Sequence, residues 1–219
     1  MVPIRERSAR SLRESHPVTQ NTHQREIHFW NRGWQYYIAG RFAVSAQLNP
    51  VAGNLLHHAI EFALKGALVK NRTLKELRGL NHGLDNLWQA FKAEVGDPKL
   101  SQFDKTIATL HAYEDLRYPD NALLNGMESV ISSHRIAGPL LAQQNPLRQA
   151  LPPVRKYELC LQDVDELTKA IFTAAKRNPR FFFNETTGLK AREALLDGNL
   201  ADLLEDPLKR NGGKGQANP

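Results

Sequence analysis

A long apolar stretch from Asn49 to about Lys70 constrains the fold of this chain more than any other feature. Its sequence, NPVAGNLLHHAIEFALKGALVK, is apolar at most positions and has helical spacing. Asn49 is a good residue for the N-cap of a helix, and Pro50 suits the first helical position. We therefore predict a helix that starts at Asn49, runs to about Lys70 and places its apolar stripe against a core.

Four ionisable side chains stand in the interior of this apolar stretch, namely His57, His58, Glu61 and Lys65. A polar group that is buried without a partner costs about 1–3 kcal/mol by mutational estimates. These side chains must therefore be paired in the folded protein or take part in its function. Either answer makes the stretch the first place to look for a functional site.

Length and composition favour one folded unit. The chain has 219 residues, of which 41% are hydrophobic, and this is enough for a single core. Cys160 is the only cysteine, which excludes an intramolecular disulfide, a redox pair and a two-cysteine metal site. The N-terminus lacks the apolar segment of a signal peptide, and no run of about 18 apolar residues could span a membrane. We expect a cytoplasmic protein that does not bind a membrane.

The formal net charge of +6 is spread along the chain. Residues 1–28 carry 5 basic and 3 acidic side chains, residues 29–150 carry 13 and 10, and residues 151–219 carry 11 and 10. One dense basic cluster, opposed only by Glu76, consists of Lys65, Lys70, Arg72, Lys75 and Arg78. The cluster could contact phosphates. In the more ordinary interpretation, these cations complement the dipole at the C-terminus of a helix.

Helical spacing of apolar residues continues on both sides of the central stretch. It predicts three further helices, over about 26–47, 84–95 and 98–116, and a short helical turn over 73–78. The last of these helices should stop near Leu116, because Pro119 disfavours helical geometry at Tyr118. Short links favour antiparallel neighbours, so we expect an all-α, antiparallel up-and-down helical bundle.

The helical period fades between residues 121 and 161. Two β-prone pieces, 128–132 and 156–161, flank a loop that begins at Pro139, and they predict a small hairpin or an irregular insertion. Asp163, with Glu166 three residues later, resembles an acidic capping box at the start of the last core helix.

The two ends of the chain differ from the middle. Residues 1–25 are polar and lack periodicity, so we expect a mobile N-terminal segment before a bundle that spans 26–183. The C-terminal extension, 184–219, should hold a weak helix over about 189–204 and then a disordered tail. Three consecutive phenylalanines, Phe181 to Phe183, would be sticky if exposed, and we expect them to dock on the bundle or on a second subunit.

Three segments carry a family resemblance. AGNLLHHAIEFALKGALV, NHGLDNLW and YEDLRYPD, in this order, resemble the HEPN domain, a family of small antiparallel helical bundles, over about residues 27–179. The family's long helix bears a Glu followed four residues later by a Lys, here Glu61 and Lys65. The family's Gly/Asn-His-x-Leu turn and its following Leu correspond to Asn81, His82, Leu84 and Leu87.

The family's ribonuclease motif is missing from this chain. Many members resemble metal-independent ribonucleases that use an Arg followed after four to six residues by a His. Residues 122–124, which follow Arg117 at this spacing, are Ala, Leu and Leu, and no histidine follows Arg135. The pair Arg10 and His16 lies in the polar N-terminal segment. Such cleavage needs a general base and a cation, so we expect no catalytic residue.

The resemblance therefore implies the family's other use. We expect a non-catalytic module that binds a nucleotide, a nucleic acid or a partner protein, in a toxin–antitoxin or defence-type system. It also implies a homodimer and a nucleotidyltransferase-type partner. A divergent ribonuclease that uses His82 or His111 with Arg117 is one alternative, and a structural partner subunit of a neighbouring enzyme is another.

Five residues are our candidates for binding a ligand: Glu61, Lys65, His82, Arg117 and Tyr118. Glu61 and Lys65 could form a structural ion pair along the helix. Alternatively, Glu61 holds Arg117 and leaves Lys65 to meet an anion, although Glu114 offers Arg117 a local partner. Arg117 is the best candidate for a phosphate contact.

A metal site in the central helix has weak support from the sequence. His57 and Glu61 lie one turn apart, and His82 or His111 could add a third ligand. However, adjacent histidines point about 100° apart on a helix, and no HExxH or Cys/His set is present. We therefore expect neither a metal nor another cofactor.

Overall fold

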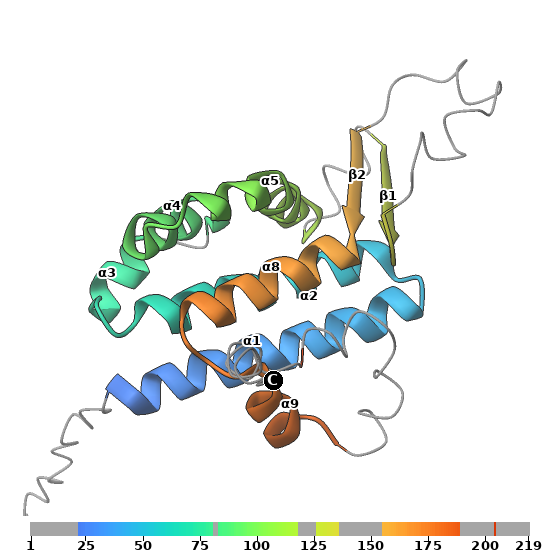
Figure 1. Cartoon of the computed structure of the whole chain (residues 1–219). Coiled ribbons are helices and arrows are strands. Elements are labelled where there is room, and N and C mark those ends of the chain that lie inside the picture. The colour runs from blue at the N-terminus through green and yellow to red at the C-terminus, as the bar shows by residue number, and fades with distance from the viewer. Residues whose placement is uncertain (1–21, 81–82, 118–125, 136–154, 189–203, 205–219) are drawn as a thin grey trace, which may run out of the picture.

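Two long antiparallel helices lie side by side at the centre of the molecule (Figure 1). They are α1 (Thr22–Ser45) and α2 (Asn49–Leu68), and they are joined by a tight turn in which Gln47 has a φ of 58°. The computed structural model describes residues 22–80, 83–117, 126–135, 155–188 and 204. Both helices occupy the predicted positions, although α1 begins before residue 26.

Glycines let α1 and α2 approach each other closely. A Cβ atom on Gly33 would lie 3.1 Å from the carbonyl oxygen of Ala59, and a Cβ atom on Gly40 would lie 2.8 Å from the side chain of Leu56. Both distances are shorter than the usual separation of non-bonded carbon atoms, about 3.5–4.0 Å. The absence of side chains at these two positions therefore allows direct packing of the two helices.

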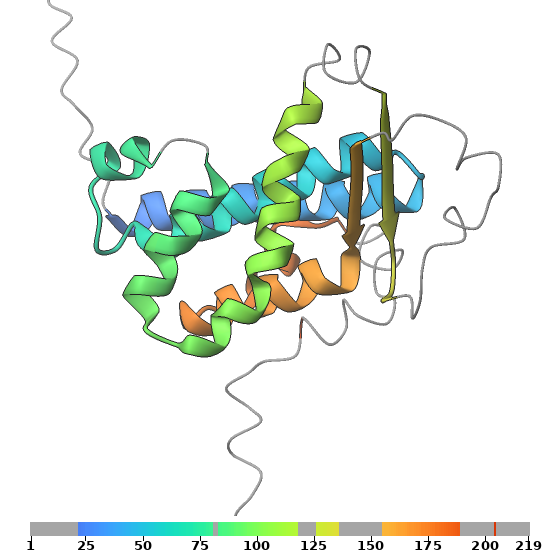
Figure 2. The same ribbon diagram turned by 90° about the horizontal axis from the view of Figure 1, so that it is seen from above.

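The remaining helices pack around this pair. They are α3 (Leu74–Gly79), α4 (Leu84–Val95), η1 (Pro98–Phe103), α5 (Asp104–Ala112), η2 (Tyr113–Arg117), α8 (Leu161–Ala174) and α9 (Pro179–Thr186). Helix α8 packs along α2, whereas α5 crosses both at a steep angle (Figure 2). The helix predicted over 98–116 is divided into three consecutive segments, η1, α5 and η2. Because α5 crosses α2 and α8, the bundle is not a simple up-and-down arrangement.

The described chain is mostly helical, with one small parallel sheet, so the predicted helical fold class is confirmed in part. The short turn over 73–78 is confirmed by α3, which starts with a capping box between Thr73 and Glu76. Within the described ranges, every helix is too short or too polar to cross a membrane.

The core lies between α1, α2, α4, α5 and α8. Helix α2 is buried along its length, with Leu56, Ile60, Leu64 and Leu68 at 1% exposure or less. Trp30, Trp34 and Tyr37 of α1 are also buried. The polar side chains of α2 therefore lie in an apolar environment.

The two strands form a parallel pair, so the predicted hairpin is wrong. Strand β1 (Met127–Ser132) pairs with β2 (Arg155–Cys160). In this register Met127 lies opposite Arg155, and Ser132 lies opposite Cys160. A parallel pair needs a crossover connection of about a dozen residues or more. Residues 133–154 are long enough for such a crossover. The Pro and Gln residues of this segment are compatible with a crossover and with a hairpin loop alike, so the composition could not reveal the direction of pairing.

Two predicted helix caps are also wrong, because tertiary partners use the capping side chains. The side-chain nitrogen of Asn49 donates to the carbonyl oxygen of Ser129 in β1, at 3.2 Å, and does not cap α2. Helix α8 begins at Leu161, before the predicted cap. Asp163 and Glu166 instead accept hydrogen bonds from the guanidinium of Arg135, each at 2.6 Å.

The predicted docking of the three phenylalanines holds for two of them. Phe182 and Phe183 are buried against the bundle, whereas Phe181 is 54% exposed. Except for Leu204, the predicted C-terminal helix over 189–204 lies outside the described residues, as do the tail, most of the loop from Pro139 and residues 1–21.

Ion pairs join α1 to α8 and to the residues that follow it. Near one end, Arg41 Nη1 lies 2.7 Å from both carboxylate oxygens of Asp165, and the Tyr37 hydroxyl donates to the same carboxylate. Burial opposes the charge of Arg41, but Tyr37 and Asp165 raise its pKa above the ordinary value. At the other end, the guanidinium of Arg177 lies 2.5 Å from the buried carboxylate of Glu26. These contacts set the position of α8 along α1.

The contact between Gly53 and Tyr113 gives a first prediction. A Cβ atom on Gly53 would overlap the Tyr113 ring, so Gly53→Ala should lower the free energy of unfolding by about 1–3 kcal/mol, measured by urea denaturation. Gly79→Ala is the matched control, because its Cβ atom would meet nothing within 4 Å. Equal stability of the two variants would contradict the tight crossing.

The buried ion pair gives a second prediction. Asp165→Asn leaves the Arg41 charge buried without its counter-ion, and it should cost about 3–5 kcal/mol of unfolding free energy in urea. The triple variant Tyr37→Phe, Arg41→Met, Asp165→Leu removes all three polar groups and should recover most of this stability. A triple variant as unstable as Asp165→Asn would show that the cost does not come from an unpaired charge.

Candidate functional site

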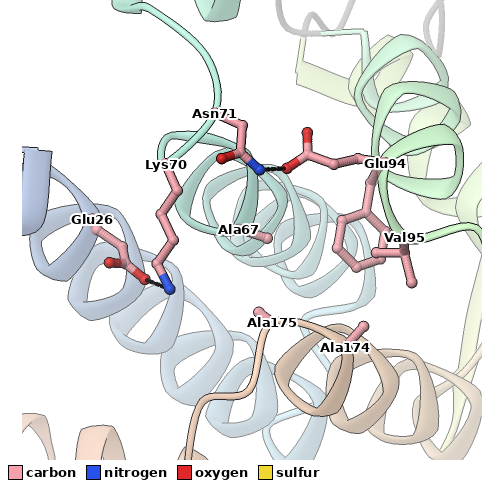
Figure 3. Close-up of a pocket in the computed structure, with 9 residues that line it drawn as sticks. Glu26, Ala67, Lys70, Asn71, Glu94, Val95, Ala174 and Ala175 are labelled. Carbon is pink, nitrogen blue, oxygen red and sulfur yellow. Dashed lines mark hydrogen bonds and ion pairs between the residues drawn. The ribbon is translucent and has the colours of Figure 1, made fainter.

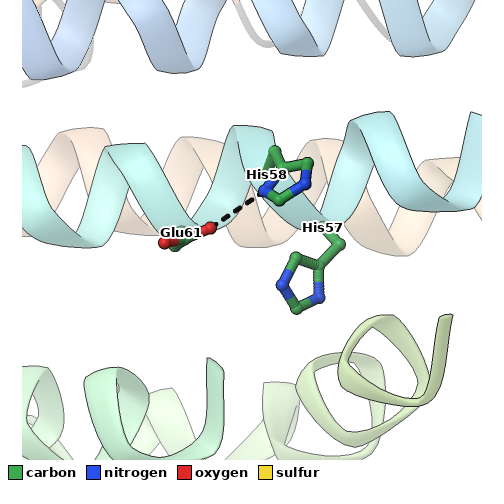
Figure 4. A group of neighbouring side chains, drawn as sticks. All are labelled: His57, His58 and Glu61. Atoms are coloured by element: carbon green, nitrogen blue, oxygen red, sulfur yellow. Dashed lines mark hydrogen bonds and ion pairs between the residues drawn. The ribbon is translucent and has the colours of Figure 1, made fainter. Parts of the chain in front are cut away.

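Glu61 is the centre of a polar network on α2. Its carboxylate belongs to a residue that is 2% exposed, and Oε1 accepts a hydrogen bond from Lys65 Nζ at 2.6 Å. Oε2 lies 2.9 Å from Nδ1 of His58 (Figure 4). These residues are three and four positions from Glu61, so the helix itself brings their side chains together. The ion pair expected between Glu61 and Lys65 is therefore present.

His57 points to the other side of the network and lacks a described partner for one of its ring nitrogens. The residue is 1% exposed, and Nδ1 lies 3.0 Å from the carbonyl oxygen of Leu110. A carbonyl oxygen can only accept, so Nδ1 carries the proton and Nε2 carries the lone pair of the neutral ring. Burial lowers the pKa of His57, which favours this neutral form. Nε2 is buried and makes no hydrogen bond within the described part of the chain.

The three side chains could together hold a metal ion. His57, His58 and Glu61 each offer one ligand atom, and these atoms all lie within 4.8 Å of one another. The expected third ligands differ from this set, because His82 lies outside the described residues and His111 is not part of the cluster.

A basic pocket opens beside Lys65, at the end of α2 that faces α3. Its volume is about 290 Å³, near the lower limit of roughly 300–1,000 Å³ for small-molecule sites. Helices α1, α2 and α3 line it with Arg25, His28, Phe29, Lys65, Leu74, Leu77 and Arg78. Polar and cationic side chains thus surround an apolar surface made by one phenylalanine and two leucines.

The positive charge of the basic pocket is only partly neutralised. Glu61 pairs with Lys65, but among the described residues Arg25 and Arg78 have no carboxylate partner. Nε of Arg25 is buried, and no described residue accepts a hydrogen bond from it. The pocket can therefore accept an anion without displacing an existing ion pair of either arginine.

The dense basic cluster divides into paired and unpaired members. Lys70 lies 3.5 Å from Glu26, and Arg72 lies 3.7 Å from Glu94. Within the described part of the chain, Lys75 and Arg78 form no ion pair with a carboxylate. Lys70 and Arg72 are thus held by carboxylates, whereas Arg78 faces the basic pocket.

A second pocket of about 300 Å³ is less suited to a charged ligand (Figure 3). It lies where α1, α2, α4 and the end of α8 meet. Its charged groups already satisfy one another, since Glu26 pairs with Lys70 and Glu94 accepts a hydrogen bond from Asn71 at 2.5 Å.

Arg117 lies away from the basic pocket. Tyr113, at the start of η2, packs on Gly53, whereas Lys65 lies 12 residues further along α2, about 18 Å of helix. Of the two partners expected for Arg117, the structure supplies Glu114, at 3.9 Å, while Glu61 holds Lys65. Figure 1 shows α3 and the end of α5 at different ends of the bundle.

Two other candidate residues, His82 and Tyr118, lie outside the described residues. The sequence analysis does not single out Arg25, because it assigns residues 1–25 to a mobile segment, and it gives His28, in the predicted first helix, no role. The i, i+4 spacing of Arg25 and Phe29 on α1 was the available signal.

The sequence and the structure were compared with those of known proteins. No family model, no curated protein and no solved structure matches the chain.

Proposed function

We propose that this chain is a non-catalytic, HEPN-like helical module that binds a phosphate-bearing ligand, a nucleotide or RNA, in the basic pocket. The observation that carries the proposal is the pair of arginines, Arg25 and Arg78, that have no carboxylate partner among the described residues and lie beside Lys65 on the wall of one pocket. Guanidinium groups bind phosphate oxygens with two parallel hydrogen bonds, and a lysine adds a point charge.

The apolar side of the pocket supports a ligand that carries a base as well as a phosphate. Phe29 is partly exposed, and its ring also contacts Phe62 at a centroid distance of 6.2 Å. A nucleobase can stack on such a ring with little dependence on its identity. The cations then hold the phosphate, and Leu74 and Leu77 cover the apolar edge of the ligand.

The HEPN-like part of the proposal rests on the resemblance of the central helix and of the two segments after it. The mostly helical fold is compatible with it. The absence of the family's Arg/His pair from the sequence favours binding without cleavage.

The experiment is a fluorescence anisotropy titration of a labelled single-stranded RNA, with calorimetry of nucleoside mono- and triphosphates alongside. The double variant Arg25→Ala, Arg78→Ala should weaken binding by at least about tenfold, because each charged hydrogen bond that it removes is worth about 1.5–3 kcal/mol. The slope of log affinity against log salt should fall by about 0.7 for each phosphate group that the variant no longer binds.

Arg180→Ala is the matched control, because Arg180 is exposed on α9 and lies outside the pocket. Equal affinity of the wild-type protein and the double variant would contradict the proposed site. Failure of the wild-type protein to bind either RNA or nucleotides would favour the structural partner subunit instead.

A second candidate function has one specific observation in its favour. His111 and Arg117 both lie near Glu114, at 3.6 and 3.9 Å, so a histidine and a cation share one surface of α5 and η2. A divergent ribonuclease would need this combination. RNA cleavage that His111→Ala abolishes would place this function ahead of simple binding.

A further inference from the structure

We propose that His57, His58 and Glu61 bind a divalent transition-metal ion of the Zn²⁺ or Co²⁺ type. All three lie within little more than one turn of α2, and their ligand atoms lie within 4.8 Å of one another (Figure 4). Two imidazoles and one carboxylate form a ligand set that proteins use for zinc. The inference does not depend on the function of the basic pocket.

The buried lone pair of His57 is the observation that distinguishes this cluster from an ordinary polar network. Nε2 makes no hydrogen bond to a described residue, although His57 is 1% exposed, and a buried acceptor of this kind normally has a partner. The contact of Nδ1 with the carbonyl oxygen of Leu110 also matches the usual state of a metal-bound histidine. Such histidines donate their other ring N–H to a carbonyl or carboxylate, which orients the ring.

The distances require only a small rearrangement of side chains. Zinc bonds to nitrogen and oxygen are about 2.0–2.2 Å long, so tetrahedral ligand atoms lie about 3.4 Å apart. Nδ1 of His58 now lies 2.9 Å from Oε2 of Glu61, and the ion would replace the proton between them. All the ligand atoms lie within 4.8 Å of one another, and rotation of His58, whose side chain is 18% exposed and whose ring lies 5.4 Å from that of Tyr36, can adjust its distance to Oε2.

Lys65 gives the proposal a specific signature. Its ammonium lies 2.6 Å from Oε1 of Glu61, whereas Nδ1 of His58 lies 2.9 Å from Oε2. A positive charge so close to the carboxylate must oppose the binding of a second cation. Removal of the Lys65 charge should therefore strengthen metal binding. If the cluster were only a structural ion pair, the same change would remove the pair and would not create any affinity for a metal.

The three protein ligands leave one tetrahedral position open. Structural zinc sites are closed by four protein ligands, whereas sites that keep an open position bind a water molecule or a substrate there. His58 is the most exposed of the three residues, so the open position is reached from its side of α2.

The experiment is a titration of the full-length, untagged protein with Co²⁺, followed by its visible d–d absorption, with Zn²⁺ competition and elemental analysis of the protein as purified. Wild-type protein should bind one ion, and His58→Ala should lower the affinity at least tenfold, because even outer-shell changes cost about 10–100-fold. Lys65→Met should raise the affinity. His134→Ala is the control for surface histidines, since His134 is exposed and outside the cluster.

Circular dichroism shows whether each variant is folded, and Glu61→Gln replaces His58→Ala if the latter unfolds. Two results would overturn the proposal. In the first, the wild-type protein does not bind Co²⁺ saturably at one ion per chain. In the second, the variant His58→Ala or Glu61→Gln is folded and binds Co²⁺ with the affinity of the wild-type protein. Because neither arginine belongs to the metal cluster, Arg25→Ala, Arg78→Ala should bind Co²⁺ like the wild-type protein, so the two proposals can fail independently.

Discussion

Helix α2 carries fully buried residues from Ala52 to Leu68, and the other helices pack around it. Glycines bring α1 against one side of it, and the Tyr113 ring lies over Gly53 on another. This burial leaves almost no solvent to satisfy His57 and Glu61, which are 1% and 2% exposed. It explains why Glu61 is paired with both Lys65 and His58. It also makes the lack of a described partner costly for the Nε2 atom of His57.

The position of α1 determines whether the basic pocket exists. Ion pairs with Asp165 and Arg177 hold α1 near its two ends. Because Glu26 faces Arg177, the preceding residue, Arg25, points about 100° away around the helix and reaches the pocket wall beside α3. The same ion pair therefore fixes the end of the bundle and the direction of a candidate ligand-binding arginine.

Much of the fold could be predicted from local signals. Local sequence patterns located α1, α2 and α4 and the short helical turn over 73–78 that contains α3. The two wrong helix caps have a common physical origin, because they concern side chains that bond across the fold. Asn49, Asp163 and Glu166 have the chemistry of helix caps, but Ser129 and Arg135 are their partners in space.

The sequence by itself determined which polar residues the central helix carries and that Glu61 and Lys65 would meet, since one helical turn brings them together. Only the tertiary structure decided that β1 and β2 are parallel, that Arg25 and Arg78 share a pocket, and that His57 keeps a buried lone pair. The reason is that these features depend on contacts between residues far apart in the chain. His57 and Leu110, for example, are 53 positions apart, and no local spacing encodes their contact.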